Sequence, residues 1–342
     1  MIRTEARPRC FVCGSEGVLA HDAIPDLMLG TPGRWRIVRC RSDDCGLLWL
    51  DPRPLPEEIG KLYHGYCMHE VDQGHGGGSA VRDQVRRVIR QRLLGYPAQA
   101  SGPVRMLASM VSLVPWFRAA ALRDLFWLPA RDIGRLLDIG CGNGGPMRRL
   151  IEAGWTVIGI DADAEAVAAA RSVGLDARVG SLKAQEFPDA CFDTILMSHV
   201  IEHLPDPIDQ LKECRRILKP TGSIVIATPN ALGMGHRIFG RHWPGLDAPR
   251  HLQVFTPAAL TRTLAMAGLV PVRVRTHAGI AASLMLGSQR WRHAEATGGL
   301  AALPAADTPV PARLVALARL QALGVACGVA WGDELVGRYA PA

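Results

Sequence analysis

The chain has 342 residues and a formal net charge of +7, from 39 Lys and Arg against 32 Asp and Glu. This length accommodates one large or two modest domains with a substantial core. The positive excess favours anionic partners but is too small to establish nucleic-acid binding. Residues 1–9 carry charges and lack the apolar stretch of a signal peptide, so export is not expected. We expect a cytoplasmic protein whose nine cysteines are reduced.

Four of these cysteines form two close pairs near the N-terminus. They are Cys10, Cys13, Cys40 and Cys45. Two residues separate the first pair and four the second, and a glycine suited to a turn follows each pair. Four thiolates match tetrahedral zinc and leave no open position, so the metal would be structural. The sequence predicts a zinc ribbon in residues 1–70, with short strands at Trp35–Arg39 and Leu47–Leu50.

Two other interpretations of this region stay open. His64 and His69 are substitute ligands, although they follow a proline-rich exit at Asp51–Pro56. Alternatively, the four cysteines hold no metal at all.

Residues 71–130 differ in character and are predicted to form a linker and a helical cap. Gly74–Gly78 is a linker candidate. Val81–Leu94 has the pattern of a basic amphipathic helix whose apolar stripe is Val85, Val88, Ile89 and Leu93. Its arginines are expected to be solvated, with a membrane or anionic-ligand surface as the alternative. Met106–Phe117 is strongly apolar but is interrupted by Pro115 and is too short to span a bilayer, so it caps the active site or lies on a membrane.

The stretch Leu-Leu-Asp-Ile-Gly-Cys-Gly-Asn-Gly at residues 136–144 is the most informative part of the chain. Its three glycines are Gly140, Gly142 and Gly144. Glycines allow positive φ and a close ligand approach, and the helix expected over Pro146–Ala153 begins with unpaired N–H groups. Asp161 ends the next strand and is placed to accept hydrogen bonds from a ribose diol. These features predict a pocket for an adenosine-containing cofactor, with a ligand-free glycine turn as the alternative.

Asp138 distinguishes between two classes of adenosine-containing cofactor. In the dinucleotide fingerprint G-x-G-x-x-G, the helix N-terminus meets a pyrophosphate. A carboxylate two residues before the first glycine would repel a diphosphate and suits the ammonium of an amino acid. The pattern resembles the class I S-adenosylmethionine-dependent methyltransferases, whose first motif runs LLDIGCGxG. The resemblance covers about residues 131–276 and implies S-adenosylmethionine as the cofactor.

Apolar β-type runs alternate with helical stretches through this region, which predicts βαβ units. The expected strands are Arg135–Ile139, Thr156–Ile160, Ala177–Val179, Thr194–Ser198, Ser223–Thr228, Val270–Thr276 and Asp333–Val336. The resemblance implies that the last strand inserts antiparallel. We therefore expect an α/β fold: a Rossmann-like, seven-stranded, mainly parallel sheet with helices on both faces, preceded by the small zinc ribbon. The methyltransferase domain would span residues 131–342, with a helical insertion at about 280–331.

The resemblance implies three further cofactor contacts, which are Ser181, Leu182 and Ser198. Relatives commonly place an acidic residue near position 181 to receive the adenine amino group. Ser181 departs from this pattern, but its hydroxyl can still accept that hydrogen bond.

The segment Ser198–Pro207 resembles the family's EHLPDP motif, which lies between cofactor and substrate. The sulfonium already makes the methyl group electrophilic, so the protein has to position the reactants and remove a proton. His199, His203 and His251 are the candidate bases, because an imidazole titrates near neutrality. Some quinone-biosynthesis O-methyltransferases have an acidic residue where His199 stands and hold a divalent ion there; the histidine argues against that role. Alternatively, Glu202 and His203 only orient a helix start.

The segment Arg237–His251 is dense in aromatic and cationic residues and is expected to form a substrate wall, with a solvated surface loop as the alternative. Thr256 and Pro257 predict the start of a helix that continues over Ala258–Ala267. Farther on, Ala312–Trp331 is apolar but interrupted by charges, so it predicts an amphipathic cover or a peripheral membrane contact, with core packing favoured.

Together these features predict an enzyme that methylates a small molecule, a sugar nucleotide or a lipid-linked glycan, preferably at oxygen. Nucleic acid is an unlikely partner, because Ser198-His199-Val200 replaces the Asn/Asp-Pro-Pro-aromatic motif of amino-group methyltransferases. RNA methylation is nevertheless the alternative among enzymes, and a catalytically inactive cofactor-binding module is the alternative outside them. The oligomeric state is not predicted.

Overall fold

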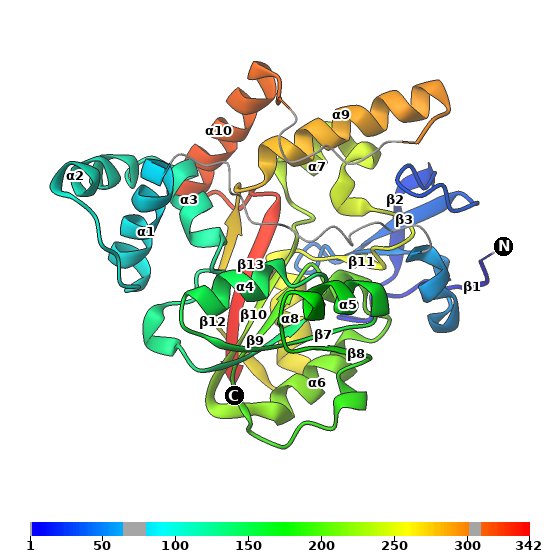
Figure 1. Ribbon diagram of the computed structural model, residues 1–342. Coiled ribbons are helices and arrows are strands. Elements are labelled where there is room, and N and C mark those ends of the chain that lie inside the picture. Colours follow the sequence, from blue (N-terminus) through cyan, green and yellow to red (C-terminus); the bar gives the residue numbers. More distant parts are fainter. Residues whose placement is uncertain (1, 64–79, 301–308) are drawn as a thin grey trace.

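The computed structural model describes residues 2–63, 80–300 and 309–342. His64, His69 and the linker candidate Gly74–Gly78 lie outside these ranges. A seven-stranded sheet forms the centre of the molecule (Figure 1). Its order is β12-β13-β10-β9-β6-β7-β8. The strands are β6 (Arg135–Ile139), β7 (Thr156–Asp161), β8 (Ala177–Val179), β9 (Phe192–Ser198), β10 (Leu218–Pro229), β12 (Leu269–His277) and β13 (Glu334–Pro341).

The strand directions confirm the predicted α/β fold. Strands β10, β9, β6, β7 and β8 run parallel to one another, and β13 is antiparallel to both β10 and β12. The inner strands are buried on both faces, as the unbroken apolar run Ile195-Leu196-Met197 indicates. All the parallel strands therefore end at one edge of the sheet, where a ligand of such a fold binds.

Helices cover both faces of this sheet. Alternate strand residues pack against α4 (Gly145–Glu152) and α5 (Ala164–Ser172) on one face. The other residues pack against α6 (Pro207–Ile217) and α8 (Pro257–Met266) on the opposite face. Thr256 caps α8 as predicted, since the Ala259 N–H donates to its Oγ1 at 3.0 Å.

The helical cap consists of α1 (Ala80–Leu94), α2 (Gly102–Val111) and α3 (Pro115–Arg123). Pro115 begins α3, which explains the break in the apolar stretch. The prediction of the apolar stripe on α1 was wrong for its last residue, Leu93. Leu93 is 47% exposed, and Leu94 is buried in its place.

The N-terminal module is built on a second, four-stranded sheet of order β11-β4-β3-β2. Strands β2 (Gly17–Ile24), β3 (Trp35–Cys40) and β4 (Leu48–Leu50) belong to the module, but β11 (Gln253–Val254) follows them by about two hundred residues. The remaining elements of the module are β1 (Thr4–Glu5), β5 (Arg53–Pro54) and η1 (Pro56–Tyr63). The module therefore shares its sheet with the loop that leads to α8.

The C-terminal region adds α7 (Met234–Phe239), α9 (Ala281–Thr297) and α10 (Ala312–Ala326). Short 3-10 turns complete the described elements: η2 (Ala130–Asp132), η3 (Lys183–Gln185), η4 (Ile201–His203), η5 (Gly240–His242) and η6 (Pro244–Leu246). Helix α10 ends earlier than predicted because the chain turns at Gly328, whose φ is 89°. Trp331 folds back so that its indole N–H donates to the Gln321 carbonyl at 3.0 Å. Among the described helices, none has the length and apolar character that a membrane crossing requires.

Arg250 joins the loop before β11 to the N-terminal module. Its side chain is 1% exposed and forms two hydrogen bonds of 2.8 Å with the carboxylate of Asp26. The guanidinium also donates to both carboxylate oxygens of Asp247, at 2.9 and 2.6 Å. One buried cation thus neutralises two carboxylates from segments far apart in the sequence.

Replacing Arg250 by Met is expected to destabilise the protein by about 3–5 kcal/mol, because Asp26 and Asp247 lose their shared counter-charge. Urea unfolding measures this loss. Arg262→Met is the matched control, since Arg262 is exposed and has no ion pair within the described residues. A loss in R250M no larger than that of the control would contradict the assignment.

Candidate active site

The glycine turn between β6 and α4 has the backbone conformation that the sequence predicts. Gly140, Gly142 and Gly144 have φ of 75°, 53° and 82°. A Cβ on Gly140 would lie 2.4 Å from Val200, and one on Gly144 would lie 2.2 Å from Leu175. Among the described residues, no atom would lie within 4 Å of a Cβ on Gly142. The first and third glycines are thus required by the protein's own packing, and the middle one faces open space.

Two carboxylates flank this turn. Asp138 is 1% exposed, and its Oδ2 has no hydrogen-bond partner within the part of the chain that the structure describes. Burial and the neighbouring charge of Asp161 raise the pKa of Asp138 to about 7. Asp161 accepts hydrogen bonds from the N–H groups of Gly142 and Asp163, at 2.8 and 2.9 Å. The unpartnered carboxylate matches the ammonium of an amino-acid cofactor, so the residues present fit S-adenosylmethionine.

The other expected cofactor residues have different surroundings. Ser181 is exposed and its Oγ accepts from the Ala184 N–H at 3.3 Å. The Leu182 side chain belongs to the main hydrophobic core. Ser198 is half-buried at the carboxyl end of β9. No contact with a cofactor is established for these three residues, so their assignment stays a prediction.

His199 follows β9 and lies between two buried carboxylates. Its Nδ1 is 3.3 Å from Glu202 Oε1, and its Nε2 is 3.1 Å from Glu334 Oε1. The residue has a φ of 57°, an uncommon conformation for a side chain other than glycine. Burial opposes a charge on His199, but Glu202 and Glu334 raise its pKa to about 9. The imidazole is therefore protonated at neutral pH.

The two carboxylates remain ionised despite their burial. Burial opposes their charge, but His199 holds the pKa of Glu202 at about 2, and Arg123 together with His199 does the same for Glu334. Arg123 reaches Glu334 from α3, with its Nε 3.3 Å from Oε2. Glu334 was predicted only as part of a strand. The register that brings it to His199 depends on a pairing between β13 and β10, which the local sequence does not show.

His203 and His251 come together near Glu202, with ring centroids 4.6 Å apart. The Nδ1 of His203 contacts the Arg250 carbonyl and the Tyr63 hydroxyl, at 3.1 and 2.8 Å. The Nδ1 of His251 contacts the Gly245 carbonyl at 2.9 Å. Between the described residues, these hydrogen bonds involve Nδ1 and not the Nε2 of either ring. Burial and the neighbouring His251 lower the pKa of His203 to about 4, so this ring is neutral at pH 7.

The same three side chains form a set of candidate metal ligands. Glu202, His203 and His251 each offer one ligand atom, and these atoms lie within 4.8 Å of one another. A carboxylate and two imidazoles suit several divalent metals, and imidazole ligands usually donate their other N–H to a carbonyl as these do. His199 takes no part in this set, since it pairs with Glu202 and Glu334. The histidine that completes the set is His251, from the later loop.

The expected substrate wall at Arg237–His251 was wrong for two of its prominent side chains. Trp243 is fully buried, and Arg250 is occupied by the two aspartates of the module interface. Dense aromatic and cationic residues therefore reflect, in part, the packing of this loop against the N-terminal module.

The four predicted zinc ligands meet at one point of that module. Their sulfur atoms all lie within 4.8 Å of one another, with Cys10 and Cys45 3.7 Å apart and Cys13 and Cys40 3.3 Å apart. Tetrahedral Zn–S bonds of about 2.3 Å place sulfurs roughly 3.8 Å apart. The geometry therefore fits a structural zinc ion. Thr256 contacts this site, because its hydroxyl donates to the Cys45 carbonyl at 2.5 Å.

Comparison with known proteins agrees with this architecture. Residues 112–274 match a family described as a methyltransferase domain. A protein of Mycolicibacterium smegmatis named as a probable S-adenosylmethionine-dependent methyltransferase is 35% identical over 147 residues, which cover 41% of this chain and 54% of that protein. A ubiquinone biosynthesis O-methyltransferase of Dinoroseobacter shibae is 33% identical over 153 residues, which cover 40% and 60% of the two chains.

Among solved structures, a SAM-dependent methyltransferase from Archaeoglobus fulgidus is 19% identical, with a TM-score of 0.43 and coverage of 68% of this chain and 98% of that one. This chain spans only about half to three fifths of the length of the curated relatives described above. The matched part of the chain, residues 112–274, is thus similar to the methyltransferase domain of S-adenosylmethionine-dependent methyltransferases.

The affinity for S-adenosylhomocysteine is expected to rise as pH increases through about 7, because Asp138 must lose its proton to pair with the ligand's ammonium. Asp138→Asn should weaken binding at pH 8 by at least about tenfold, or about 1.4 kcal/mol, and flatten this part of the pH profile. Calorimetric titration between pH 6 and 8.5 measures both effects. Asp176→Asn, at an exposed site, is the control. An unchanged slope in D138N would exclude Asp138 as the titrating group.

His199 is expected to stabilise the folded protein in a pH-dependent manner. Because its folded pKa of about 9 exceeds its ordinary value of 6.5, its contribution is complete below pH 6.5 and is lost as pH rises through 9. The stability gap between the wild type and His199→Gln should therefore narrow between pH 6.5 and 9.5. Urea unfolding at several pH values tests this, and a gap that widens over that interval would refute it.

Proposed function

We propose that the protein transfers a methyl group from S-adenosylmethionine to an oxygen atom of a small-molecule acceptor. The observation that carries this proposal is the buried, unpartnered carboxylate of Asp138 beside the open space at Gly142, a pairing suited to an amino-acid cofactor. Oxygen is favoured because a relative from Dinoroseobacter shibae bears the name ubiquinone biosynthesis O-methyltransferase. A sugar nucleotide or lipid-linked glycan acceptor stays a finer prediction.

Bound S-adenosylmethionine would supply an electrophilic methyl group. In the proposed reaction, the acceptor oxygen would form the new O–CH₃ bond as the methyl–sulfur bond breaks and S-adenosylhomocysteine leaves, while the hydroxyl proton passes to the Nε2 of His203 or His251. His203 is suited to this because its imidazole is neutral at pH 7. His199 was also a candidate base, but its raised pKa means that it already carries a proton. We therefore assign His199 a positioning role through Glu202 and Glu334.

Two metal sites accompany this proposal. The four cysteines of the N-terminal module would hold a structural zinc ion, without a part in the reaction. As the alternative to the base role of the two histidines, Glu202, His203 and His251 would hold a divalent cation, which as a Lewis acid would favour ionisation of a hydroxyl bound beside it. A histidine that ligates such a cation is not available as the base, so the two roles of His203 and His251 exclude each other.

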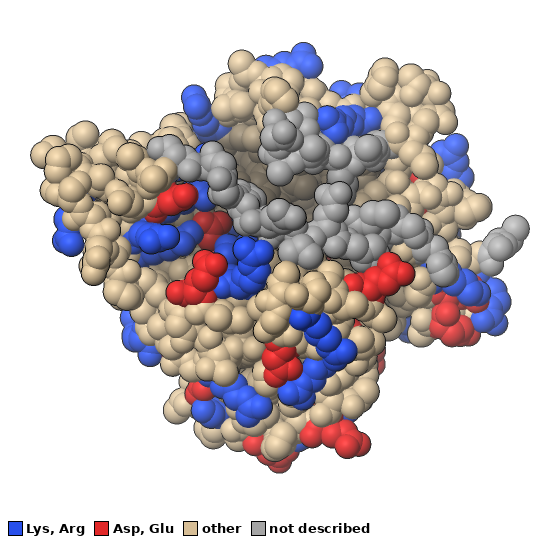
Figure 2. Space-filling view, in the orientation of Figure 1, with Lys and Arg blue, Asp and Glu red and all other residues tan. Residues whose placement is uncertain are grey.

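Cytoplasmic location and peripheral membrane contact stay predictions. The contact is supported by large apolar side chains that α2 and the following turn expose, which are Met106, Leu107, Met110 and Leu113. The far end of the cap, at the left of Figure 2, is accordingly mostly free of charged side chains.

The function is tested by incubating the purified protein with methyl-labelled S-adenosylmethionine and a panel of acceptors that includes catechols, simple phenols and sugar nucleotides. Labelled product should form with at least one hydroxyl compound. His203→Ala and His251→Ala should lower turnover by about 10²-fold or more, the usual contribution of a general base. His293→Ala, on the exposed side of α9, should retain full turnover.

Metal analysis and EDTA treatment of the same preparation distinguish the two roles of the histidine pair. Loss of activity on chelation, restored by Mg²⁺ or Mn²⁺, would assign His203 and His251 as ligands; full activity without a divalent metal would assign one of them as the base. Full turnover in both alanine variants would contradict the proposed site.

A further inference from the structure

A large groove lies away from the glycine turn, between the helical cap, α10 and one face of the outer strands. Its volume is about 1040 Å³, at the upper end of the range of small-molecule sites. The cap contributes Leu93 and Leu122 to its walls, α10 contributes Val325, and the sheet contributes Val272 and Val336. These apolar walls provide space for a hydrocarbon chain.

The charges of this groove all have one sign. Five arginines line it, which are Arg118, Arg131, Arg273, Arg275 and Arg338. None of the described residues that line the groove is an aspartate or a glutamate. Asp132, outside the lining, pairs with Arg131 and Arg338 at 3.7 and 2.6 Å. Within the described residues, Arg118, Arg273 and Arg275 have no ion pair of this kind.

The sequence around the groove also carries an excess of positive charge. Residues 80–131 contain nine arginines, two aspartates, no lysine and no glutamate, which gives this segment a net charge of +7. The whole chain also carries +7, so the remaining residues sum to zero. The positive excess of the protein is therefore concentrated in the cap that forms one wall of the groove.

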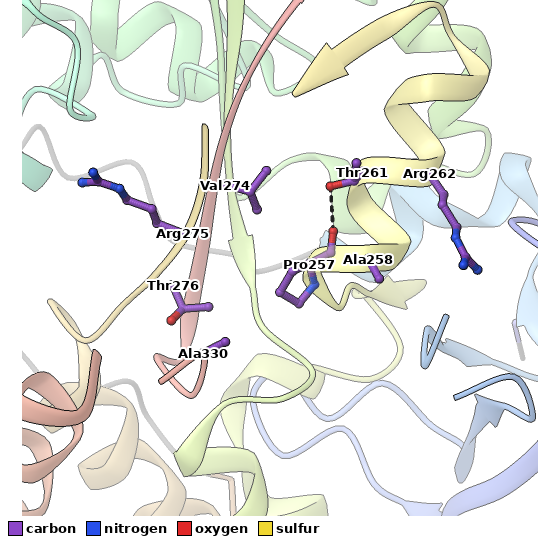
Figure 3. A pocket seen from close by; sticks show the side chains of 8 residues that line it. All are labelled: Pro257, Ala258, Thr261, Arg262, Val274, Arg275, Thr276 and Ala330. Carbon is purple, nitrogen blue, oxygen red and sulfur yellow. Dashed lines mark hydrogen bonds between the residues drawn. The ribbon is translucent and has the colours of Figure 1, made fainter. Parts of the chain in front are cut away.

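A second hollow adjoins the groove along the edge strand β12, and Val274, Arg275, Thr276 and Ala330 line both. This smaller hollow, of about 440 Å³, lies between β12 and α8 (Figure 3). Val274 points toward Thr261 of α8, whereas Arg275 extends in the opposite direction, as the alternation of a strand requires (Figure 3). The side chain of Arg275 thus extends away from α8.

One end of the groove approaches the candidate active site. His277 lines the groove at the carboxyl end of β12 and stacks against Trp127, with ring centroids 3.8 Å apart. His277 is also the register partner of Glu334, which holds His199. The groove is therefore next to the cluster of His199, Glu202 and Glu334 but does not include the glycine turn.

We propose that this groove binds a single-chain amphiphile with a phosphate headgroup. The hydrocarbon chain lies against the apolar walls, and the phosphate accepts hydrogen bonds from Arg273, Arg275 and Arg118, since guanidinium groups bind phosphate in a bidentate manner. The positive charge of the arginines favours an amphiphile with an anionic headgroup. The apolar walls favour a ligand with a hydrocarbon chain over an inorganic anion. This binding does not depend on the proposed methyl transfer.

The experiment is calorimetric titration of the full-length protein with dodecyl phosphate below its micelle concentration, without S-adenosylmethionine. Saturable binding is expected, and the double variant Arg273→Gln, Arg275→Gln should weaken it by at least about tenfold. Arg87→Gln with Arg237→Gln is the matched control, because it removes the same charge from exposed sites outside the groove. Ala119→Trp, which fills the groove from α3, should also weaken binding while melting at a temperature near that of the wild type.

Two further probes separate the contributions of head and chain. Inorganic phosphate and dodecyltrimethylammonium should each bind at least about tenfold more weakly than dodecyl phosphate. The proposal is overturned if dodecyltrimethylammonium or inorganic phosphate binds as tightly as dodecyl phosphate. It is also overturned if the control variant loses as much affinity as the Arg273, Arg275 double variant. Because the titration contains no cofactor, a failure to bind dodecyl phosphate leaves the methyltransferase proposal unaffected. A failure of the methyl-transfer assay likewise leaves the amphiphile proposal unaffected.

Discussion

Two buried carboxylates stay ionised side by side at the carboxyl edge of the sheet because an imidazolium lies between them. Glu202 comes from the turn after β9 and Glu334 from the start of β13, and His199 contacts both. Thr228 at the end of β10 donates to the second oxygen of Glu202 at 2.9 Å, and Arg123 approaches Glu334 from the cap. Strand β13, the turn after β9 and the helical cap thus meet at one charge-balanced cluster. The histidine pair and the end of the groove are both adjacent to it.

A second constraint acts on the loop that supplies His251. The chain before β11 is held to the N-terminal module by the Arg250 guanidinium, and β11 itself pairs with β4. Leu252 accepts a backbone hydrogen bond from Leu50 at 3.0 Å, and the Glu202 carbonyl accepts one from Leu252 at 2.8 Å. The module is therefore a support for the wall of the candidate active site, which explains how a cysteine-rich segment far from the glycine turn bears on the position of His251.

Much of this fold could be predicted because its signals are local. Each central strand is an apolar run bounded by turn residues, and Asp138 with its glycines forms a contiguous motif. The two cysteine pairs likewise have a recognisable spacing. Even the start of α8 at Thr256 and Pro257 follows from neighbouring residues alone.

The features that sequence reasoning missed are those decided by distant partners. Arg250 looked like a substrate contact, because nothing near it shows that Asp26 lies more than two hundred residues earlier. Leu93 and Leu94 are adjacent apolar residues on one helix, and only the packing against α3 and the sheet decides which one is buried. His199 has the ordinary titration of an imidazole in isolation; its charge follows from Glu334, which the register of an antiparallel strand brings to it.

The Thr256 hydroxyl forms two hydrogen bonds. It accepts one from the backbone of the first turn of α8 and donates the other to the carbonyl of Cys45, one of the four clustered cysteines. The first turn of a helix that covers the central sheet is thereby fixed to the turn that carries Cys45. Such a ribbon cannot be exchanged between proteins as an independent unit. A chimera would have to inherit the ribbon together with the β11 loop and the start of α8, because these segments share hydrogen bonds that neither side can satisfy alone.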